Sequence, residues 1–264
     1  MCDKCLAIIE NAPRVYRRPL TAIELEWGDV DNVRDQMEAS EEGVVKIAKP
    51  VLVKIVAQLV DEYRPLVERG DIAGVARVSP SFTGDLAQAL RVAQQSAVTR
   101  GKRQVLTMAK KAGVRLAAKR PVKDPAKAAA YLEARSEAMS EQIQAQIAAS
   151  VKRTVLGAAA VGEWDDEIAE TIANTATRSL VASAIEVARE AFAVGRLYGY
   201  EEIKEDVAYV VYTAVLDDSV CEVCEALDQT QYDDPDEGFE AAPNAECLGG
   251  IERCRCYPIA VMRR

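Results

Sequence analysis

The residues best suited to chemistry in this chain of 264 residues are cysteines, and most of them lie close together. Of seven cysteines, five follow residue 220, at Cys221, Cys224, Cys247, Cys254 and Cys256. Cys221 and Cys224 form a C-x₂-C pair, whose turn points two sulfurs at one tetrahedral ion, and the later cysteines can complete its coordination. Because the chain contains no histidine, we expect a zinc ion held by thiolates, alone or with carboxylates.

Five thiols compete for the four positions of such a site. Cys221 and Cys224 are expected to be partners, and the other positions fall to Cys247, Cys254 or Cys256. Cys254 and Cys256 are two residues apart and would leave a tight loop if both bound the ion, which favours Cys247, with Cys256 packed nearby. Two disulfides or a reduced core cluster are the alternatives, but a C-x₂-C pair in a cytosolic protein favours metal.

Catalysis by this zinc ion is not expected. A catalytic zinc keeps one position open for water, whereas surplus thiols fill every position and stabilise the fold. The chain also lacks a P-loop and the G-x-S-x-G, H-E-x-x-H and G-x-G-x-x-G motifs. Asp217 and Asp218 are expected to orient the cysteine loop through bonds to backbone amides. The alternative, a divalent ion held by these acids for phosphodiester cleavage, ranks last, and we predict that the protein is not an enzyme.

Charge is distributed unevenly along the chain, whose net charge is −9. Residues 201–246 contain fifteen acids and one base, whereas residues 99–123 contain nine bases and no acid. Such runs usually form solvated faces, and we favour that interpretation. The alternative is a basic helix that binds nucleic acid or a partner through Arg100, Lys102, Arg103, Lys110 and Lys111. The acidity around the cysteines would repel a phosphate backbone.

No feature of the sequence predicts secretion or membrane insertion. The first residues are not followed by a long apolar stretch, and the most apolar runs, 51–60 and 207–216, are too short to span a bilayer. We therefore expect synthesis in a reducing cytosol, where clustered cysteines bind metal more often than they form disulfides. Cys2 and Cys5 form a second C-x₂-C pair, which we interpret as coincidental because one pair supplies half a site.

Helical periodicity dominates the first two thirds of the chain. Residues 1–43 are polar and irregular and are predicted to form an N-terminal arm. Apolar residues at three- and four-residue spacing then predict a helical region over 44–160. Pro65, Gly101 and the small residues of 157–162 are expected to end or interrupt its helices.

The last third, 161–264, is predicted to be a separate α+β domain. A long helix is expected over about 165–200, and a β-rich strand over 207–216. The cysteine segment that follows is rich in proline and glycine and would need a metal ion to order it. The predicted fold is therefore mainly α, with an elongated helical N-terminal region and a small C-terminal module that carries a zinc-knuckle-like loop.

Several short segments after residue 183 occur in an order typical of one family. They are Ile185-Glu186-Val187-Ala188-Arg189, Gly195-Arg196-Leu197, Tyr200-Glu201-Glu202, the L-D-D-x-x-C-x-x-C-x-x-L-D run from Leu216 to Asp228, and Cys254-Arg255-Cys256. In this order, over about residues 160–264, they resemble the MuF-type phage head morphogenesis proteins, the minor capsid proteins of tailed phages.

The chain departs from that family at three places. Ala184 and Ile185 stand where the family usually has Arg-Thr, and Gln229-Thr230 stands where a glycine often follows the C-x₂-C segment. The family commonly has His-Pro ahead of its C-R-C, and Cys247 is interpreted as the substitute for that histidine. The resemblance also implies that Cys254 is the third ligand.

The resemblance implies a structural function in the virion. A protein of this type would enter the phage head in several copies, contact the portal and the capsid protein from inside, and assist head assembly, genome packaging or delivery. It would be made in the host cytoplasm, with packaged DNA as a further partner. The alternative, a zinc-ribbon-type nucleic-acid-binding protein, would use the basic helix at 99–123. A metal-dependent nuclease is the third hypothesis.

Overall fold

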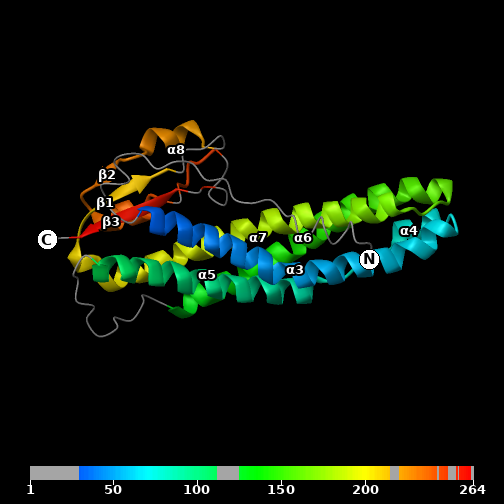
Figure 1. Ribbon diagram of the computed structural model, residues 1–264, viewed down its shortest axis with the longest axis horizontal. Helices are drawn as coiled ribbons and strands as arrows, with labels where there is room; N and C mark the ends of the chain where they lie inside the picture. The colour runs from blue at the N-terminus through cyan, green and yellow to red at the C-terminus, as the bar shows by residue number, and fades with distance from the viewer. Residues whose placement is uncertain are drawn as a thin grey trace. The chain divides into compact units, whose positions relative to one another are not determined.

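The computed structural model describes residues 30–111, 125–214, 220–242, 244–248, 254 and 256–262 (Figure 1). In chain order its elements are α3 (Val30–Glu68), α4 (Ile72–Arg77), α5 (Thr83–Lys111), α6 (Pro125–Val161), α7 (Asp166–Ile203), a 3₁₀ turn (Lys204–Asp206), β1 (Val207–Thr213), α8 (Glu222–Leu227), β2 (Gln231–Tyr232), α9 (Pro235–Glu240) and β3 (Tyr257–Met262). Long helices are thus followed by a small α+β module that carries the cysteine cluster, which confirms the predicted fold class.

Helix α3 is longer than the sequence pattern predicted. It begins at Val30, inside the segment 1–43 that was expected to be an irregular arm, and the rest of that segment lies outside the described residues. The helix also continues through Pro50 and through Pro65, the second of which was expected to end or interrupt it. Each proline removes one helical hydrogen bond, and burial of the apolar stripe, including Leu52 beside the first proline, offsets that loss.

The predicted interruption at Gly101 was wrong, and the one at 157–162 was wrong in part. Helix α5 passes through Gly101, and α6 passes through Gly157 before it ends at Val161. The residue that ends α6 is Gly162, whose φ of +76° is the left-handed conformation that commonly follows a helix. The predicted breaks within 157–162 are therefore reduced to this one glycine.

The described residues form two compact units. Unit 1 contains Gly43–Ala93 and Ala130–Ile185, and unit 2 contains residues 30–42, 94–111, 125–129 and the described residues from Glu186 onward. Helices α3, α5, α6 and α7 each contribute to both units. This division differs from the predicted segments 1–43, 44–160 and 161–264.

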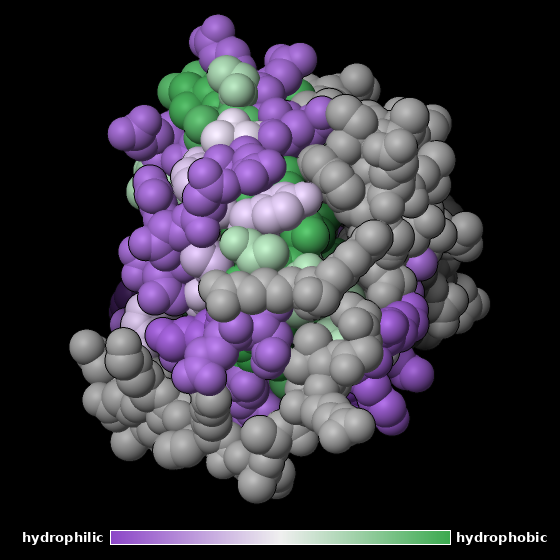
Figure 2. Space-filling model, turned by 90° about the vertical axis from the view of Figure 1, so that its left-hand side faces the viewer, coloured by the Kyte–Doolittle hydropathy of each residue, from purple (hydrophilic) through white to green (hydrophobic). Residues whose placement is uncertain are grey.

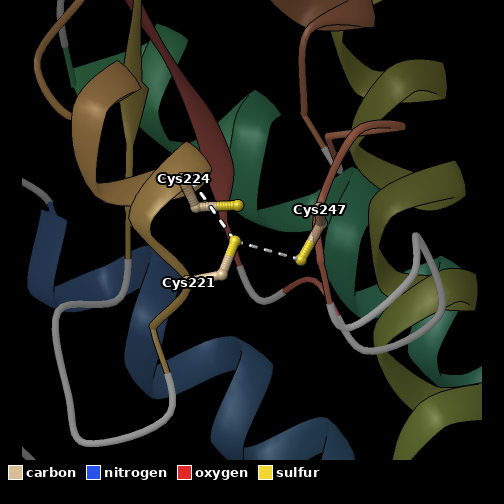
Figure 3. A group of neighbouring side chains, drawn as sticks. All are labelled: Cys221, Cys224 and Cys247. Atoms are coloured by element: carbon tan, nitrogen blue, oxygen red, sulfur yellow. Dashed lines mark hydrogen bonds between the residues drawn. The ribbon is translucent and has the colours of Figure 1, made fainter.

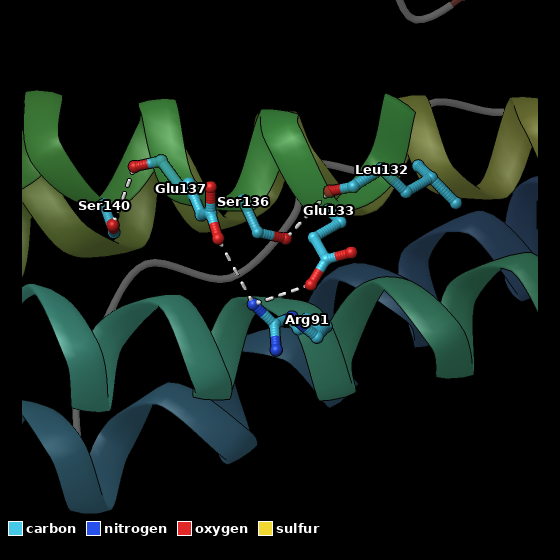
Figure 4. Close-up of polar contacts among 6 residues, drawn as sticks. All are labelled: Arg91, Leu132, Glu133, Ser136, Glu137 and Ser140. Atoms are coloured by element: carbon cyan, nitrogen blue, oxygen red, sulfur yellow. Dashed lines mark hydrogen bonds and ion pairs between the residues drawn. The ribbon is translucent and has the colours of Figure 1, made fainter. Parts of the chain in front are cut away.

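Unit 1 has a core of apolar stripes from four helices. Its fully buried side chains include Leu52, Ile55, Val56, Leu59 and Tyr63 of α3, Leu86 and Leu90 of α5, Met139, Ile143, Ile147, Val151 and Val155 of α6, and Ile172 and Leu180 of α7. On its surface, Arg91 of α5 lies 3.3 Å from Glu133 and 3.6 Å from Glu137 of α6 (Figure 4). These carboxylates are mostly exposed, so the ion pairs contribute little and the buried stripes supply most of the stability.

In unit 2, glycines allow α5 and α7 to approach each other closely. A Cβ atom on Gly101 would lie 2.1 Å from the backbone oxygen of Phe192, and one on Gly195 would lie 2.1 Å from that of Val98. No side chain fits at such a separation, so both positions require glycine. The close approach brings Arg196, next to Gly195, within hydrogen-bonding distance of Gln104 on α5.

The sheet of unit 2 has the strand order β2-β1-β3, with both pairs antiparallel. β1 occupies the start of the predicted strand 207–216, and 215–219 lie outside the described residues. In the β1–β3 pair, Thr213 faces Tyr257. This register places the end of β1 beside the start of β3, where the last two cysteines lie.

Helix α9 joins the sheet to α7. The ring of Phe239 stacks on Tyr200, with ring centroids 3.8 Å apart, and the Tyr200 hydroxyl donates a 2.6 Å hydrogen bond to Asp236. Gly238 lets α9 lie against β1, because a Cβ atom there would be 2.5 Å from Cβ of Val210.

Figure 2, which views the molecule from the left-hand side of Figure 1, shows hydrophilic side chains around a smaller group of hydrophobic ones.

Candidate metal centre

The cysteines reach one region of unit 2 from three segments. Cys221 is the N-cap of α8 and Cys224 lies in its first turn. Cys247 belongs to the segment 244–248, and Cys254 and Cys256 immediately precede β3. All five are free thiols. The antiparallel pairing of β1 with β3 holds the last two near the end of β1.

The sulfur atoms form two overlapping groups. Cys221, Cys224 and Cys247 make one group and Cys224, Cys254 and Cys256 the other, and within each group the sulfurs all lie within 4.8 Å of one another. Figure 3 shows the first group, with sulfurs from the start of α8 and from the segment before β3 turned toward each other. Cys224 is therefore the residue that the two groups share.

The separations between sulfurs match those of metal ligands. The Sγ atoms of Cys221 and Cys247 are 3.7 Å apart, and those of Cys224 and Cys254 are 3.8 Å apart. Zn–S bonds of about 2.3 Å in a tetrahedral site imply sulfur separations of about 3.8 Å. A disulfide would need about 2.05 Å. The thiols of this region could thus hold a metal ion.

Backbone and amide N–H groups point at three of the sulfurs. The N–H of Cys224 donates to Sγ of Cys221 at 3.4 Å. The N–H of Asn244 donates to Sγ of Cys254 at 3.3 Å, and the Asn244 side-chain amide donates to Sγ of Cys224 at 3.9 Å. Such donors stabilise a thiolate, and in metal sites they orient the ligands from outside the first shell.

The thiols differ in how readily they ionise. The N–H of Cys224 is the main reason that the pKa of Cys221 is lowered to about 7. A hydrogen bond with Cys256 is the main reason that the pKa of Cys254 is lowered to about 5. The same pairing, together with burial, raises the pKa of Cys256, and burial raises that of Cys224. A divalent cation bound here would balance the negative charge of such thiolates.

Tyr212 adds a buried polar group to the centre. Its side chain is fully buried in β1, and its hydroxyl has no hydrogen-bond partner of acceptable geometry among the described residues. The hydroxyl lies beside the thiols of Cys224 and Cys256, and burial is the main reason that its pKa is raised. It therefore stays protonated and can donate to a sulfur that becomes a thiolate, which fits a metal-bound state of the cluster.

Four other residues that the sequence analysis singled out cannot be compared with the cluster. Asp217 and Asp218, expected to orient the loop, and the pair Cys2 and Cys5 lie outside the described residues. Their expected role therefore stays a prediction, and among the described residues the backbone N–H groups that donate to the sulfurs include those of Cys224 and Asn244.

The basic residues of α5 are partly committed to contacts inside unit 2. Lys102 forms an ion pair with Glu202, and Arg100 donates to the side-chain oxygen of Gln36 at 3.2 Å. Arg103, Lys110 and Lys111 have exposed side chains. Residues 112–123, the rest of the basic run, lie outside the described residues. The five predicted contacts with phosphate thus do not form one uniform exposed row.

Sequence reasoning missed two residues of the centre, Tyr212 and Asn244. Tyr212 was identified only as part of a β-rich strand, and the register of β1 with β3 decides that it faces the thiols. Asn244 lies among turn-forming residues three positions before Cys247. A polar side chain so close to a ligand was the one available signal, since such residues often bond back to the loop.

No protein-family model matches the chain, and no curated protein or solved structure matches it either. Within the described residues, no helix has both the length and the apolar character needed to cross a bilayer. The function must therefore be argued from the residues and their geometry.

Proposed function

We propose that this chain is a structural minor head protein of the MuF type, which enters the head of a tailed phage and contacts the portal and the capsid protein. The observation that carries the proposal is that separate segments of the resemblance meet in one module. Gly195 and Arg196 of α7 bring that helix against α5 and β3, where the C-x₂-C pair and the closing cysteines gather. Segments that are far apart in the sequence but meet in the fold support the resemblance better than any single motif does.

The metal in this proposal is zinc, with a structural role. Thiolates suit Zn²⁺, and the sulfur separations of 3.7 and 3.8 Å agree with a tetrahedral site. Zinc would supply the positive charge that the buried thiolates need and would order the segments between β1 and β3. With every position taken by sulfur, no water is activated, so the module acts as a rigid part of an assembly and not as an enzyme.

Partner binding would fall to the helices and to the exposed surface of the module. Helices α8 and α9 carry exposed acids, among them Glu222, Glu225 and Glu240, which suit a basic partner surface. The resemblance implies that the protein lies inside the head, near the portal, in several copies per particle.

The test is affinity purification of the tagged chain from cells that express the neighbouring phage head genes, read by mass spectrometry. Portal and major capsid protein are expected in the eluate, and the chain is expected in purified particles. The tag alone is the background control, and Cys224→Ser reports whether capture needs the metal module. An eluate that holds nucleic acid but no head protein would overturn the proposal in favour of a nucleic-acid-binding protein.

The nucleic-acid alternative has weaker support. Lys102 and Arg100 already have partners in unit 2, so at most the exposed remainder of the basic helix would contact phosphate. Binding of a DNA duplex that weakens steeply with salt, and that is lost in Arg103→Gln with Lys110→Gln, would favour this alternative.

A further inference from the structure

Each thiol of the cysteine cluster belongs to a group of three sulfurs. Cys221, Cys224 and Cys247 form the first group, and Cys224, Cys254 and Cys256 form the second. Within each group every sulfur lies within 4.8 Å of the other two. Because Cys224 is common to both groups, the five sulfurs form two triangles that meet at one corner.

A triangle of sulfurs is a complete set of ligands for a three-coordinate ion. Metal–sulfur bonds of about 2.3 Å in a planar three-coordinate site place the sulfurs about 4.0 Å apart. The sulfurs of Cys221 and Cys247 are 3.7 Å apart in the first group, and those of Cys224 and Cys254 are 3.8 Å apart in the second. Each group can therefore hold such an ion without a fourth sulfur.

Monovalent copper is the ion that this set of donors suits. Thiolate sulfur is a soft ligand that selects Cu(I) as well as Zn²⁺, whereas harder ions prefer oxygen. Cu(I) readily accepts three thiolates as its whole coordination shell, whereas Zn²⁺ in a structural site takes four ligands. Among the described residues each group consists of cysteines alone, and the chain has no histidine.

The shared corner requires a thiolate that binds two ions at once, which a sulfur with several lone pairs can do. Cys224 is buried, and the side-chain amide of Asn244 donates to its Sγ at 3.9 Å. The hydroxyl of Tyr212 is buried beside Cys224 and Cys256 and has no hydrogen-bond partner of acceptable geometry among the described residues. These donors offset part of the negative charge that the thiolates would keep around two monovalent ions.

We infer that the cluster can bind two Cu(I) ions, one in each sulfur group, with the thiolate of Cys224 bridging them. The thiols release their protons to solvent as the ions bind, and the copper enters and remains as Cu(I), so no oxidant or reductant takes part. The inference goes beyond the proposed zinc binding. Because it concerns a different ion at the same thiols, it can fail while zinc binding holds, and the reverse.

The test is an anaerobic titration of the metal-free full chain with Cu(I) acetonitrile in competition with a chromophoric Cu(I) chelator. Every protein carries Cys2→Ser and Cys5→Ser, because that pair lies outside the described residues and can take a copper ion of its own. Native mass spectrometry should count two copper ions in this background protein. X-ray absorption should show a short copper–copper vector, as expected for ions that share a sulfur.

Cys224→Ser and Cys256→Ser, made in that background, are a matched pair because each removes one thiol of the cluster. Cys256→Ser leaves the first group whole and should hold one ion against the chelator. Cys247→Ser leaves the second group whole and should also hold one. Cys224→Ser breaks both groups and should lose both ions, although it keeps as many thiols as the other two variants.

Three results would each overturn the inference. They are a single copper ion in the background protein, two ions without the copper–copper vector, and equal retention of copper by Cys224→Ser and Cys256→Ser. The absorption measurement needs no substitution within the cluster, so it decides the question even if a variant does not fold, which circular dichroism would reveal. A parallel titration with zinc tests the proposed zinc centre separately.

Discussion

The guanidinium group of Arg196 on α7 donates a hydrogen bond from Nη2 to the backbone carbonyl of Pro258 on β3. Its Nε donates to Gln104 of α5 at 3.1 Å, and the group lies 5.7 Å from the ring centroid of Tyr257. Pro258 and Tyr257 follow Cys256 directly in the sequence. One buried side chain therefore ties two helices to the strand that directly follows the last two cysteines of the cluster.

Replacing Arg196 by lysine is expected to destabilise unit 2. Burial lowers the pKa of Arg196 to about 10, so it remains a cation at neutral pH, and lysine would keep the charge but lose the planar fork that reaches two acceptors. Leaving one buried acceptor unsatisfied should lower the free energy of unfolding by about 1–3 kcal/mol. Denaturant titration measures the change.

The matched control is Arg103→Lys, at an exposed position of α5. Its free energy of unfolding should change by less than about 0.5 kcal/mol. Equal effects of the two substitutions would show that the contacts of Arg196 do not hold β3 in place.

Substitution of Gly195 by alanine tests the close approach of α5 and α7. The new Cβ atom would lie 2.1 Å from the backbone oxygen of Val98, so the helices must separate. The cost of overpacking should exceed the gain in helix propensity and lower the free energy of unfolding by about 2 kcal/mol. Thermal and denaturant unfolding both report it.

Gly157→Ala, also within a helix, is expected to have the opposite effect on stability. Nothing lies within 4 Å of a Cβ atom placed on Gly157. Alanine there should raise the free energy of unfolding by up to about 1 kcal/mol, because it is the better helix former. If both alanine variants were stabilised, the α5–α7 approach in unit 2 would be looser than the structure has it.

The helices of unit 1 were predictable because their signal is local. A stripe such as Met139, Ile143, Ile147 and Val151 repeats at the helical period, and all four side chains are buried. Gly101 was misread as a break because its role depends on a backbone oxygen of Phe192, ninety-one positions further along the chain. A tertiary contact of this kind leaves no trace in the local pattern, and so glycine was read as a helix breaker.

The cysteine cluster was predictable from the sequence, but its surroundings were not. Cysteine spacing indicates a shared ion without knowledge of the fold, and the structure brings Cys221, Cys224 and Cys247 together. Which donors face the sulfurs depends on strand register and loop path. Tyr212 and Asn244 therefore became visible only in the folded chain.

Tyr212→Phe is expected to weaken zinc binding without unfolding the protein. The substitution removes only a hydroxyl that is buried beside Cys224 and Cys256 and has no hydrogen-bond partner of acceptable geometry among the described residues. If that hydroxyl donates to a metal-bound thiolate, zinc affinity should fall by about tenfold. Competition with a chromophoric chelator measures the affinity, and Tyr209→Phe on the same strand is the control. Equal affinities in the wild type and in Tyr212→Phe would exclude this role.

Removal of the metal should affect the two units unequally. A chelator is expected to leave the far-ultraviolet circular dichroism of the long helices almost unchanged, because the buried stripes of unit 1 do not depend on the centre. The segments between β1 and β3 should become sensitive to protease, and the thiols Cys221 and Cys247 should become reactive. Mass spectrometry of the cleavage and alkylation products locates both changes. Uniform unfolding of all helices would contradict the division into units.

Acidification is expected to weaken zinc binding, with changes of slope at the two thiols whose pKa is lowered. Cys221 and Cys254 have pKa values of about 7 and about 5, so both are thiolates above this range and take up protons as the pH falls through it. A group with a lowered pKa stabilises the folded, metal-binding state at high pH and loses that contribution on acidification. The apparent zinc affinity, measured by chelator competition from about pH 8 to about pH 4, should fall more steeply below about pH 7, where Cys221 of the metal-free protein takes up a proton, and more steeply again below about pH 5, where Cys254 does. In Cys254→Ser the binding that survives at neutral pH should be lost at a higher pH than in the wild type, because the thiolate that resists protonation longest is gone.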